Sequence, residues 1–278
     1  MTLLRQFDDL IYIVDSLLPL FLQNLLMHQT SKQLGLIRWI QIATHVIGGV
    51  CTLSFIFPFL TRVQKDQKIQ AWSRKLLNIF GIHLSIHGQY PSDLPYLVAS
   101  NHISWLDIHV INAFKPIRFV AKSEVEGWPI FGWMAKQLGT VFIRRDSSRH
   151  ARQVVGQMAK VLQTESICIF PEGTSTNGES VLLFKSNLFE AAIASQTPVL
   201  PLAIQYTNKA TGRRSEAPAF IGDMGLLESM GNVLNEPNLE ATLTFLPVIQ
   251  PVLGSSTDRK ALANRAQSHI SEALQLHL

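Results

Sequence analysis

The chain has 278 residues, enough for one large domain, or for one domain with an appendage, around a sizeable core. Hydrophobic residues make up 47% of it and charged residues only 16%, against roughly 25% charged in an average soluble domain, so part of the apolar excess is expected in contact with lipid. The net charge of +4 without a dense Lys/Arg block argues against a nucleic-acid groove and favours an anionic membrane surface or a phosphorylated substrate as partner. The chain has only two cysteines, which excludes a disulfide framework and fits a reducing, cytoplasmic setting.

The N-terminal segment opens with an apolar cluster at residues 17–22. No small-residue cleavage site follows it, so a removable signal peptide is not expected. The cluster fits either a helix lying in the membrane interface or a helix packed on the next segment.

Residues 39–60 contain no Lys, Arg, Asp or Glu. A helix of that length can cross a hydrocarbon core of ~30 Å, although a half-inserted hairpin with the first apolar cluster would bury the same surface. Either arrangement attaches the chain to a membrane. The positive charges that follow outnumber Lys32 and Arg38 before the segment, which predicts that the globular part stays on the cytoplasmic side; they are Arg62, Lys65, Lys68, Arg74 and Lys75.

From about residue 82 the pattern changes to short apolar strands that alternate with helices. We expect strands at residues 83–88, 96–100, 117–121, 140–143, 167–170, 199–206 and 241–248. Apolar residues at helical spacing predict one helix at 154–162 and a closing amphipathic helix after residue 257. Residues 209–218 are expected to form a solvated basic loop. The fold class is therefore α/β, with a mixed, largely parallel sheet flanked by helices and an N-terminal membrane-attached helical segment.

A polar turn with His102 and Asp107 follows the strand expected at 96–100. In open α/β sheets ligands gather beyond the carboxyl ends of strands. On one straight helix the two side chains would point roughly 140° apart, so they meet only if His102 lies in the turn before the helix. Ser104 with Asp107 resembles a capping box that would begin the helix there. A carboxylate on one ring nitrogen would leave the other as a general base; alternatively, Asp107 complements the helix dipole and His102 fills a polar turn.

Two other readings of this turn fit the sequence less well. A metal site on His102, Asp107 and His109 would need further ligands, and no second carboxylate or Cys cluster accompanies them. A serine hydrolase centred on Ser104 lacks the G-x-S-x-G elbow. We therefore expect no metal.

Paired arginines end the strand expected at 140–143. Alternation along a strand sends Arg144 and Arg145 to opposite sides, so only one of them need grip a phosphate. A surface salt bridge with Asp146 is the alternative.

A loop rich in Gly, Ser and Thr follows the strand expected at 167–170. Gly173 permits a tight turn, and hydroxyl and backbone N–H groups could hold an anion, but the G-K-[ST] ending of a P-loop is missing. Glu172 could hold the loop or a substrate hydroxyl. Further on, prolines bracket the strand expected at 199–206, which is by itself a structural signal.

Taken together and in order, these segments resemble the glycerolipid acyltransferase family of the 1-acylglycerol-3-phosphate O-acyltransferase type. The resemblance spans roughly residues 70–210. Its four blocks are N-H-x-x-x-x-D (the HX4D motif) at 101–107, G-x-x-F-I-x-R at 139–145, F-P-E-G-T-R at 170–175 and a proline-bearing strand at 199–202. It implies an acyltransferase domain over 71–278 behind membrane-associated helices over 1–70.

The resemblance also implies roles for single residues. His102 would be the general base that takes the proton of the acceptor hydroxyl, and Asp107 would orient it. The acyl group would come from acyl-CoA or acyl carrier protein as co-substrate, with no further cofactor. The substrate-binding residues would be Gly139, Phe142, Ile143, Arg145, Glu172, Gly173, Thr174, Ser175 and Pro201, with Arg145 as the phosphate ligand.

One position departs from the pattern of the family. Ser175 stands where phosphatidate-forming members usually have Arg, which removes a phosphate contact worth about 1.5 to 3 kcal/mol if a charged hydrogen bond was made. We expect 1-acylglycerol-3-phosphate as the acceptor, giving phosphatidate, with lyso-ornithine lipid as the alternative. A non-catalytic lipid-binding membrane protein is the alternative from a different class, although it would not need the His102/Asp107 pair.

Overall fold

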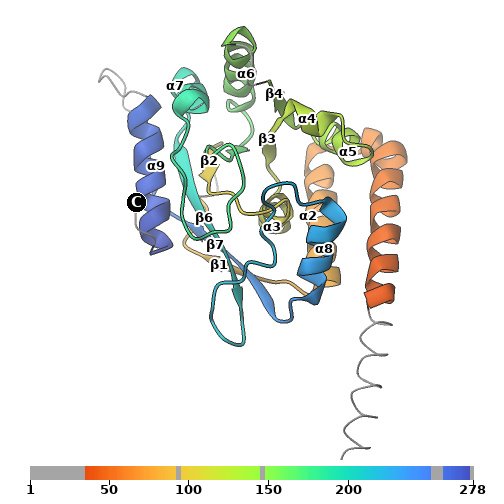
Figure 1. Ribbon diagram of the computed structural model, residues 1–278. Helices are drawn as coiled ribbons and strands as arrows, with labels where there is room; N and C mark the ends of the chain where they lie inside the picture. The colour runs from red at the N-terminus through yellow and green to blue at the C-terminus, as the bar shows by residue number, and fades with distance from the viewer. Residues whose placement is uncertain (1–34, 92–94, 145–147, 252–258, 276–278) are drawn as a thin grey trace, which may run out of the picture. The chain divides into compact units, whose positions relative to one another are not determined.

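The computed structural model describes residues 35–91, 95–144, 148–251 and 259–275 (Figure 1). The chain divides into two compact units, residues 1–46 and 47–278. The apolar cluster at 17–22 lies outside the described residues. The division expected near residue 70, between membrane-associated helices and an acyltransferase domain, stays a prediction.

The second unit contains a seven-stranded sheet in the order β1-β7-β6-β2-β5-β3-β4. Neighbouring strands are parallel except β6 and β7. The strands are β1 His83–His87, β2 Leu97–Ser100, β3 Arg118–Lys122, β4 Val141–Ile143, β5 Ile167–Ile169, β6 Val199–Asn208 and β7 Leu239–Phe245. The mixed, largely parallel sheet predicted from the alternation of strands and helices is confirmed. The last strand ends at Phe245, earlier than expected, because Pro247 has no N–H group to donate to the ladder.

Helices cover both faces of the sheet, as Figure 1 shows. They are α2 Arg62–Phe80, α3 Leu106–Phe114, α4 Ser123–Glu126, α5 Phe131–Gln137, α6 Ser148–Val161, α7 Glu190–Ser195, α8 Leu226–Asn235 and α9 Arg259–Ala273, with a 3-10 turn at Ser186–Phe189. The main core joins apolar residues of β2, β5 and β6 to those of α6, α7 and α9. The predicted inward stripes of α6 and α9 are confirmed, since Met158, Leu162 and Ile270 are buried.

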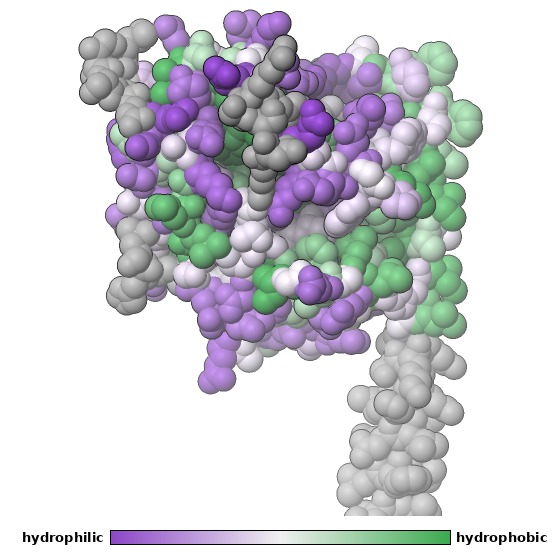
Figure 2. All heavy atoms as spheres, turned by 45° about the horizontal axis from the view of Figure 1, so that its top comes forward, coloured by the Kyte–Doolittle hydropathy of each residue, from purple (hydrophilic) through white to green (hydrophobic). Residues whose placement is uncertain are grey.

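One helix among the described residues, Gly35–Phe59, is long and apolar enough to cross a membrane. Figure 2 colours many of its side chains as hydrophobic. Its last two turns are a π-helix, Thr52–Ile56, and a 3-10 helix, Phe57–Phe59. Thr61 then caps α2 through a capping box with Gln64, so the chain turns sharply from the apolar helix into a polar one.

Candidate active site

Strand β2 lies between β5 and β6 and ends in the turn that carries His102. At the first turn position, the side-chain amide of Asn101 donates to the carbonyl of Ile204 at 2.9 Å and accepts from the Ile204 N–H at 2.8 Å. Asn101 is buried. Its amide therefore replaces the backbone pairing that ends with the strand, and it fixes the start of the turn to β6.

Asp107 holds His102 from the first turn of α3. The Nδ1 atom of His102 lies 2.8 Å from Asp107 Oδ2, which also accepts from the N–H groups of Ile103 at 2.8 Å and Ser104 at 3.0 Å. The hydroxyl of Tyr206 donates to Asp107 Oδ1 at 2.8 Å. In the tautomer with its proton on Nδ1, His102 donates to Asp107 Oδ2, and Nε2 keeps a lone pair.

The burial of this pair is uneven in a way that suits proton transfer. The Asp107 side chain is 0% exposed and the His102 side chain is 23% exposed. His102 lies before the helix, as its spacing from Asp107 requires. The two readings of Asp107 turn out to be compatible, since one carboxylate satisfies N–H groups at the helix start and also orients the imidazole.

Glu172, in the loop after β5, holds the backbone of His102. Its Oε1 accepts from the His102 N–H at 2.7 Å and its Oε2 from the Leu182 N–H at 2.9 Å. Thr176 N–H donates to the His102 carbonyl at 2.9 Å. Burial raises the pKa of Glu172 to about 7, although the two N–H bonds act in the opposite direction. The loop therefore holds the peptide groups on both sides of His102.

An aromatic side chain covers one face of the imidazole. The rings of His102 and Phe170 are stacked with their centroids 4.1 Å apart, and Phe119 continues the stack at 6.3 Å from Phe170. With its backbone, Nδ1 and one ring face fixed, His102 presents Nε2 in a defined direction.

The remaining predicted site residues lie in three places. Gly139 precedes β4 with a left-handed φ of 77°, and Phe142 and Ile143 are half-buried on that strand, with Ile143 packed against the main core. Arg145 lies outside the described residues.

The third block forms the loop around Glu172, and the fourth lies within the sheet. Gly173 has a left-handed φ of 77°, Thr174 is exposed, and the Ser175 hydroxyl donates to the Phe220 carbonyl. Pro201 is buried in β6 beside Ala99 of β2. The structure thus joins His102, Asp107 and Glu172 by direct hydrogen bonds, and Pro201 stands in the sheet that supports them.

Sequence reasoning did not find Tyr206. Burial raises the pKa of its hydroxyl well above the usual value, so the group stays protonated and donates to Asp107. A signal was available, because a buried tyrosine in a central strand needs a partner for its O–H.

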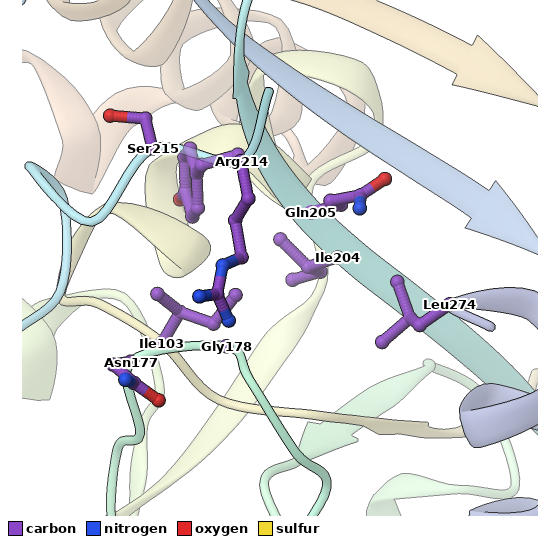
Figure 3. Close-up of a pocket in the computed structure, with 9 residues that line it drawn as sticks. Ile103, Asn177, Gly178, Ile204, Gln205, Arg214, Ser215 and Leu274 are labelled. Carbon is purple, nitrogen blue, oxygen red and sulfur yellow. The ribbon is translucent and has the colours of Figure 1, made fainter. Parts of the chain in front are cut away.

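A cavity of about 240 Å³ lies next to Ile103 of the His102 turn (Figure 3). Its lining also includes Gly178, Ile204, Tyr206 and Arg214. Arg214 Nη2 pairs with Glu179 at 2.6 Å and with Glu216 at 3.3 Å. The prediction of a merely solvated basic loop at 209–218 is therefore wrong for Arg214. Its guanidinium pairs with carboxylates from two segments and lines the cavity.

In the part of the chain that the structure describes, no three His, Cys, Asp or Glu side chains are grouped to hold a metal ion. The turn itself offers one imidazole and one carboxylate, and both are already bonded to each other. The arrangement is an oriented, partly exposed imidazole beside a polar loop.

Comparison with known proteins gives consistent matches. The model of the family described as Acyltransferase matches residues 82–205. The lyso-ornithine lipid O-acyltransferase of Pseudomonas aeruginosa is 33% identical over 87% of this chain and 87% of its own length. The 1-acyl-sn-glycerol-3-phosphate acyltransferase of Neisseria gonorrhoeae is 35% identical over 63% of this chain and 67% of its own.

A solved structure has the same fold. The 1-acyl-sn-glycerophosphate (LPA) acyltransferase PlsC from Thermotoga maritima superposes with a TM-score of 0.65 at 20% identity, over 87% of this chain and 94% of that one. At that identity the likeness concerns the fold.

Proposed function

The chain belongs to the acyltransferase family, and from that premise we propose a membrane-attached O-acyltransferase that moves an acyl group from acyl-CoA or acyl carrier protein to the free hydroxyl of a lysolipid. The observation that carries this proposal is the hydrogen bond of 2.8 Å between His102 Nδ1 and Asp107. It leaves Nε2 as a base on a side chain that is still partly exposed.

The proposed reaction proceeds in one displacement. Nε2 of His102 takes the proton as the acceptor hydroxyl oxygen forms a bond to the thioester carbonyl carbon. The carbon–sulfur bond then breaks, and the leaving thiolate takes the proton back from the imidazolium. Asp107 stabilises that imidazolium, and no covalent enzyme intermediate, metal or further cofactor is required.

We propose lyso-ornithine lipid ahead of 1-acylglycerol-3-phosphate as the acceptor, which reverses the order drawn from the sequence alone. Ser175 brings no cation to the loop, and its hydroxyl is engaged by the Phe220 carbonyl. The relative matched over 87% of both chains carries the name of the ornithine-lipid enzyme. Arg145 remains the proposed ligand of a phosphate or carboxylate on the acceptor, with Gly139, Phe142, Thr174 and Pro201 shaping its surroundings.

The proposed location is the cytoplasmic face of a membrane, attached through the helix Gly35–Phe59. The positive charges at the start of α2 favour that side. Both the lysolipid and its product stay in the bilayer, so attachment keeps the enzyme with its substrates.

The test is a direct assay with labelled donor. Membranes that contain the chain are supplied with acyl-CoA or acyl carrier protein and each of the two lysolipids in turn. We expect acylated ornithine lipid as the major product. If no lysolipid is acylated although lipid is bound, the chain is a binding protein; if phosphatidate predominates, the proposed order of acceptors is wrong.

A further inference from the structure

Apolar side chains gather on the surface of the corner between α4 and α5, away from the His102 turn. Exposed large residues at this corner are Trp128, Ile130, Phe131 and Trp133. In an ordinary soluble domain, a cluster of this kind marks a contact surface. We propose that this corner, the 128–133 wedge, inserts into the headgroup region of the bilayer and docks the α/β unit on it.

The backbone holds the wedge outward. Ile130 has φ 64° and ψ −61°, and the Phe131 N–H donates to the Pro129 carbonyl at 2.6 Å, which is the geometry of a strained γ-turn. A β-branched residue is a rare occupant of such a turn. The turn leaves Ile130 52% exposed, so a strained backbone conformation holds an apolar side chain at the surface.

The backbone behind the wedge is closely packed at Gly132. A Cβ atom on Gly132 would lie 2.4 Å from the Glu126 carbonyl oxygen, so α5 touches the end of α4 directly. The Gly132 N–H bonds to Trp128, and the Met134 N–H to Ile130. These contacts fix the backbone of the loop against the end of α4.

The helix α5, which carries Phe131 and Trp133 of the wedge, packs against the end of the apolar helix. On its inner side, α5 packs Met134 against Leu53 and Phe57. The alternate residues of the same stretch, Phe55 and Phe59, are exposed. Leu53 to Phe59 close the segment that we propose to lie in the bilayer, and α5 packs on that end.

The chemistry of the wedge identifies a lipid surface as its occupant. Two tryptophans with aliphatic and aromatic neighbours suit the zone between headgroups and acyl chains. The charges nearby are balanced, with Lys122 and Lys136 against Glu124 and Glu126, and Lys136 pairs with Glu126 at 3.3 Å. Attraction should therefore be apolar and should depend little on anionic lipid or on salt.

Docking through the wedge would help catalysis if the chain acylates a lysolipid, so this part of the inference rests on the proposed function. The wedge lies between β3 and β4, and residues 139–145, proposed to bind the acceptor, follow α5 directly. Holding this edge at the bilayer would let a lysolipid reach the site without leaving the membrane entirely.

Depth-dependent quenching tests the placement without any assay of activity. The full chain with Cys51→Ser receives an environment-sensitive fluorophore at Phe131→Cys and is reconstituted in vesicles of phosphatidylethanolamine with a minor share of phosphatidylglycerol. The control is Leu183→Cys, which is also exposed and lies by Lys260 of α9, across the sheet in Figure 1. Trp133→Cys repeats the measurement if Phe131→Cys fails to fold.

We expect a blue-shifted emission at position 131 that lipids with a nitroxide on the upper acyl chain quench, and water-like emission at position 183. Water-like emission at both positions overturns the proposal. A blue shift that lipid does not quench and that disappears on dilution also overturns it, because a second copy then covers the wedge.

A kinetic experiment separates this inference from the proposed function. In Ile130→Ser/Phe131→Ser the KM for a lysolipid presented in vesicles should rise roughly tenfold. Turnover of a short-chain lysolipid dissolved as monomers should stay unchanged. Equal losses of activity with the vesicle-bound and the monomeric substrate in the double variant would contradict docking. If the unaltered chain is inactive with both substrates, the proposed function is wrong, and the quenching result still tests the docking.

Discussion

Two strands next to the proposed site residues differ in their place in the sheet: β2, which ends in the His102 turn, lies inside it, and β4, within residues 139–145, lies at its edge. β2 has β5 and β6 hydrogen-bonded on its two sides, whereas β4 is at the end of the sheet and, among the described strands, pairs with β3 alone. The first is buried along its whole length, and the second is half-buried after Val141.

The difference separates the proposed base from the segment proposed to surround the acceptor. The geometry of His102 is fixed by groups from three segments, namely Asp107, Tyr206 and Glu172. An edge strand can change its side chains with fewer consequences for packing, because it has one neighbour instead of two. A sheet built in this way can keep one reaction and vary its acceptor.

The sharpest test of the central position is His102→Ala. Loss of a general base should lower the rate of acyl transfer about a thousandfold. Thermal unfolding should change little, since the side chain is only partly buried. His87→Ala, an exposed histidine on the edge strand β1, is the matched control and should retain full activity. Normal activity in His102→Ala would remove the proposed mechanism.

The pH dependence of stability tests the loop that supports His102. Burial raises the pKa of Glu172 to about 7 from 4.5. Between those values the folded chain keeps a proton that the unfolded chain has lost, so the free energy of unfolding falls as pH rises, by about 3 kcal/mol in all. Glu172→Gln should remove this decline, as urea unfolding across that range would show.

Glu179→Gln serves as the control for the same loop, because this glutamate is exposed and pairs with Arg214 at the surface. It should preserve the decline. An equal slope in the unaltered chain and in Glu172→Gln would mean that Glu172 is ionised throughout, and the two N–H bonds would then outweigh its burial.

The sheet could be predicted from the sequence because its strands are marked locally. Strands buried on both faces read as continuous apolar runs bounded by turn residues, and each expected run contains a strand. The meeting of His102 and Asp107 was equally predictable, since they are five positions apart and a helix start lies between.

Contacts across long stretches of chain could not be predicted in this way. Tyr206 reaches Asp107 over 99 positions, and Asn101 reaches Ile204 over 103. These pairs depend on β2 lying beside β6, which local patterns do not specify. Arg214 shows both cases, since its partner Glu216 is two positions away and its partner Glu179 is 35 positions away.

Tyr206→Phe tests one such contact. Removing the hydroxyl leaves Asp107 Oδ1 buried without its donor, which should cost about 2 kcal/mol of stability. The rate should fall roughly tenfold, and its pH profile should shift because the carboxylate that stabilises the imidazolium has changed.

Tyr90→Phe provides the comparison, since the Tyr90 hydroxyl bonds to Ser166 at 3.1 Å, away from the His102 turn. It should lose stability without a shift in the pH profile. If both variants alter stability alone, Tyr206 supports the fold and has no part in orienting the base.

The smallest expected effect concerns the acceptor. Ser175→Arg restores the cation that phosphatidate-forming relatives usually carry, and it gives up the bond to the Phe220 carbonyl. The ratio of kcat/KM for 1-acylglycerol-3-phosphate to that for lyso-ornithine lipid should rise roughly fivefold, equivalent to about 1 kcal/mol. Ser175→Ala loses the same bond without adding charge and should leave the ratio unchanged. A rise in both variants would show that loss of the bond to Phe220, and not the added cation, changes the choice of acceptor. Acceptor specificity would then depend on the loop around Glu172 that also holds the backbone of His102.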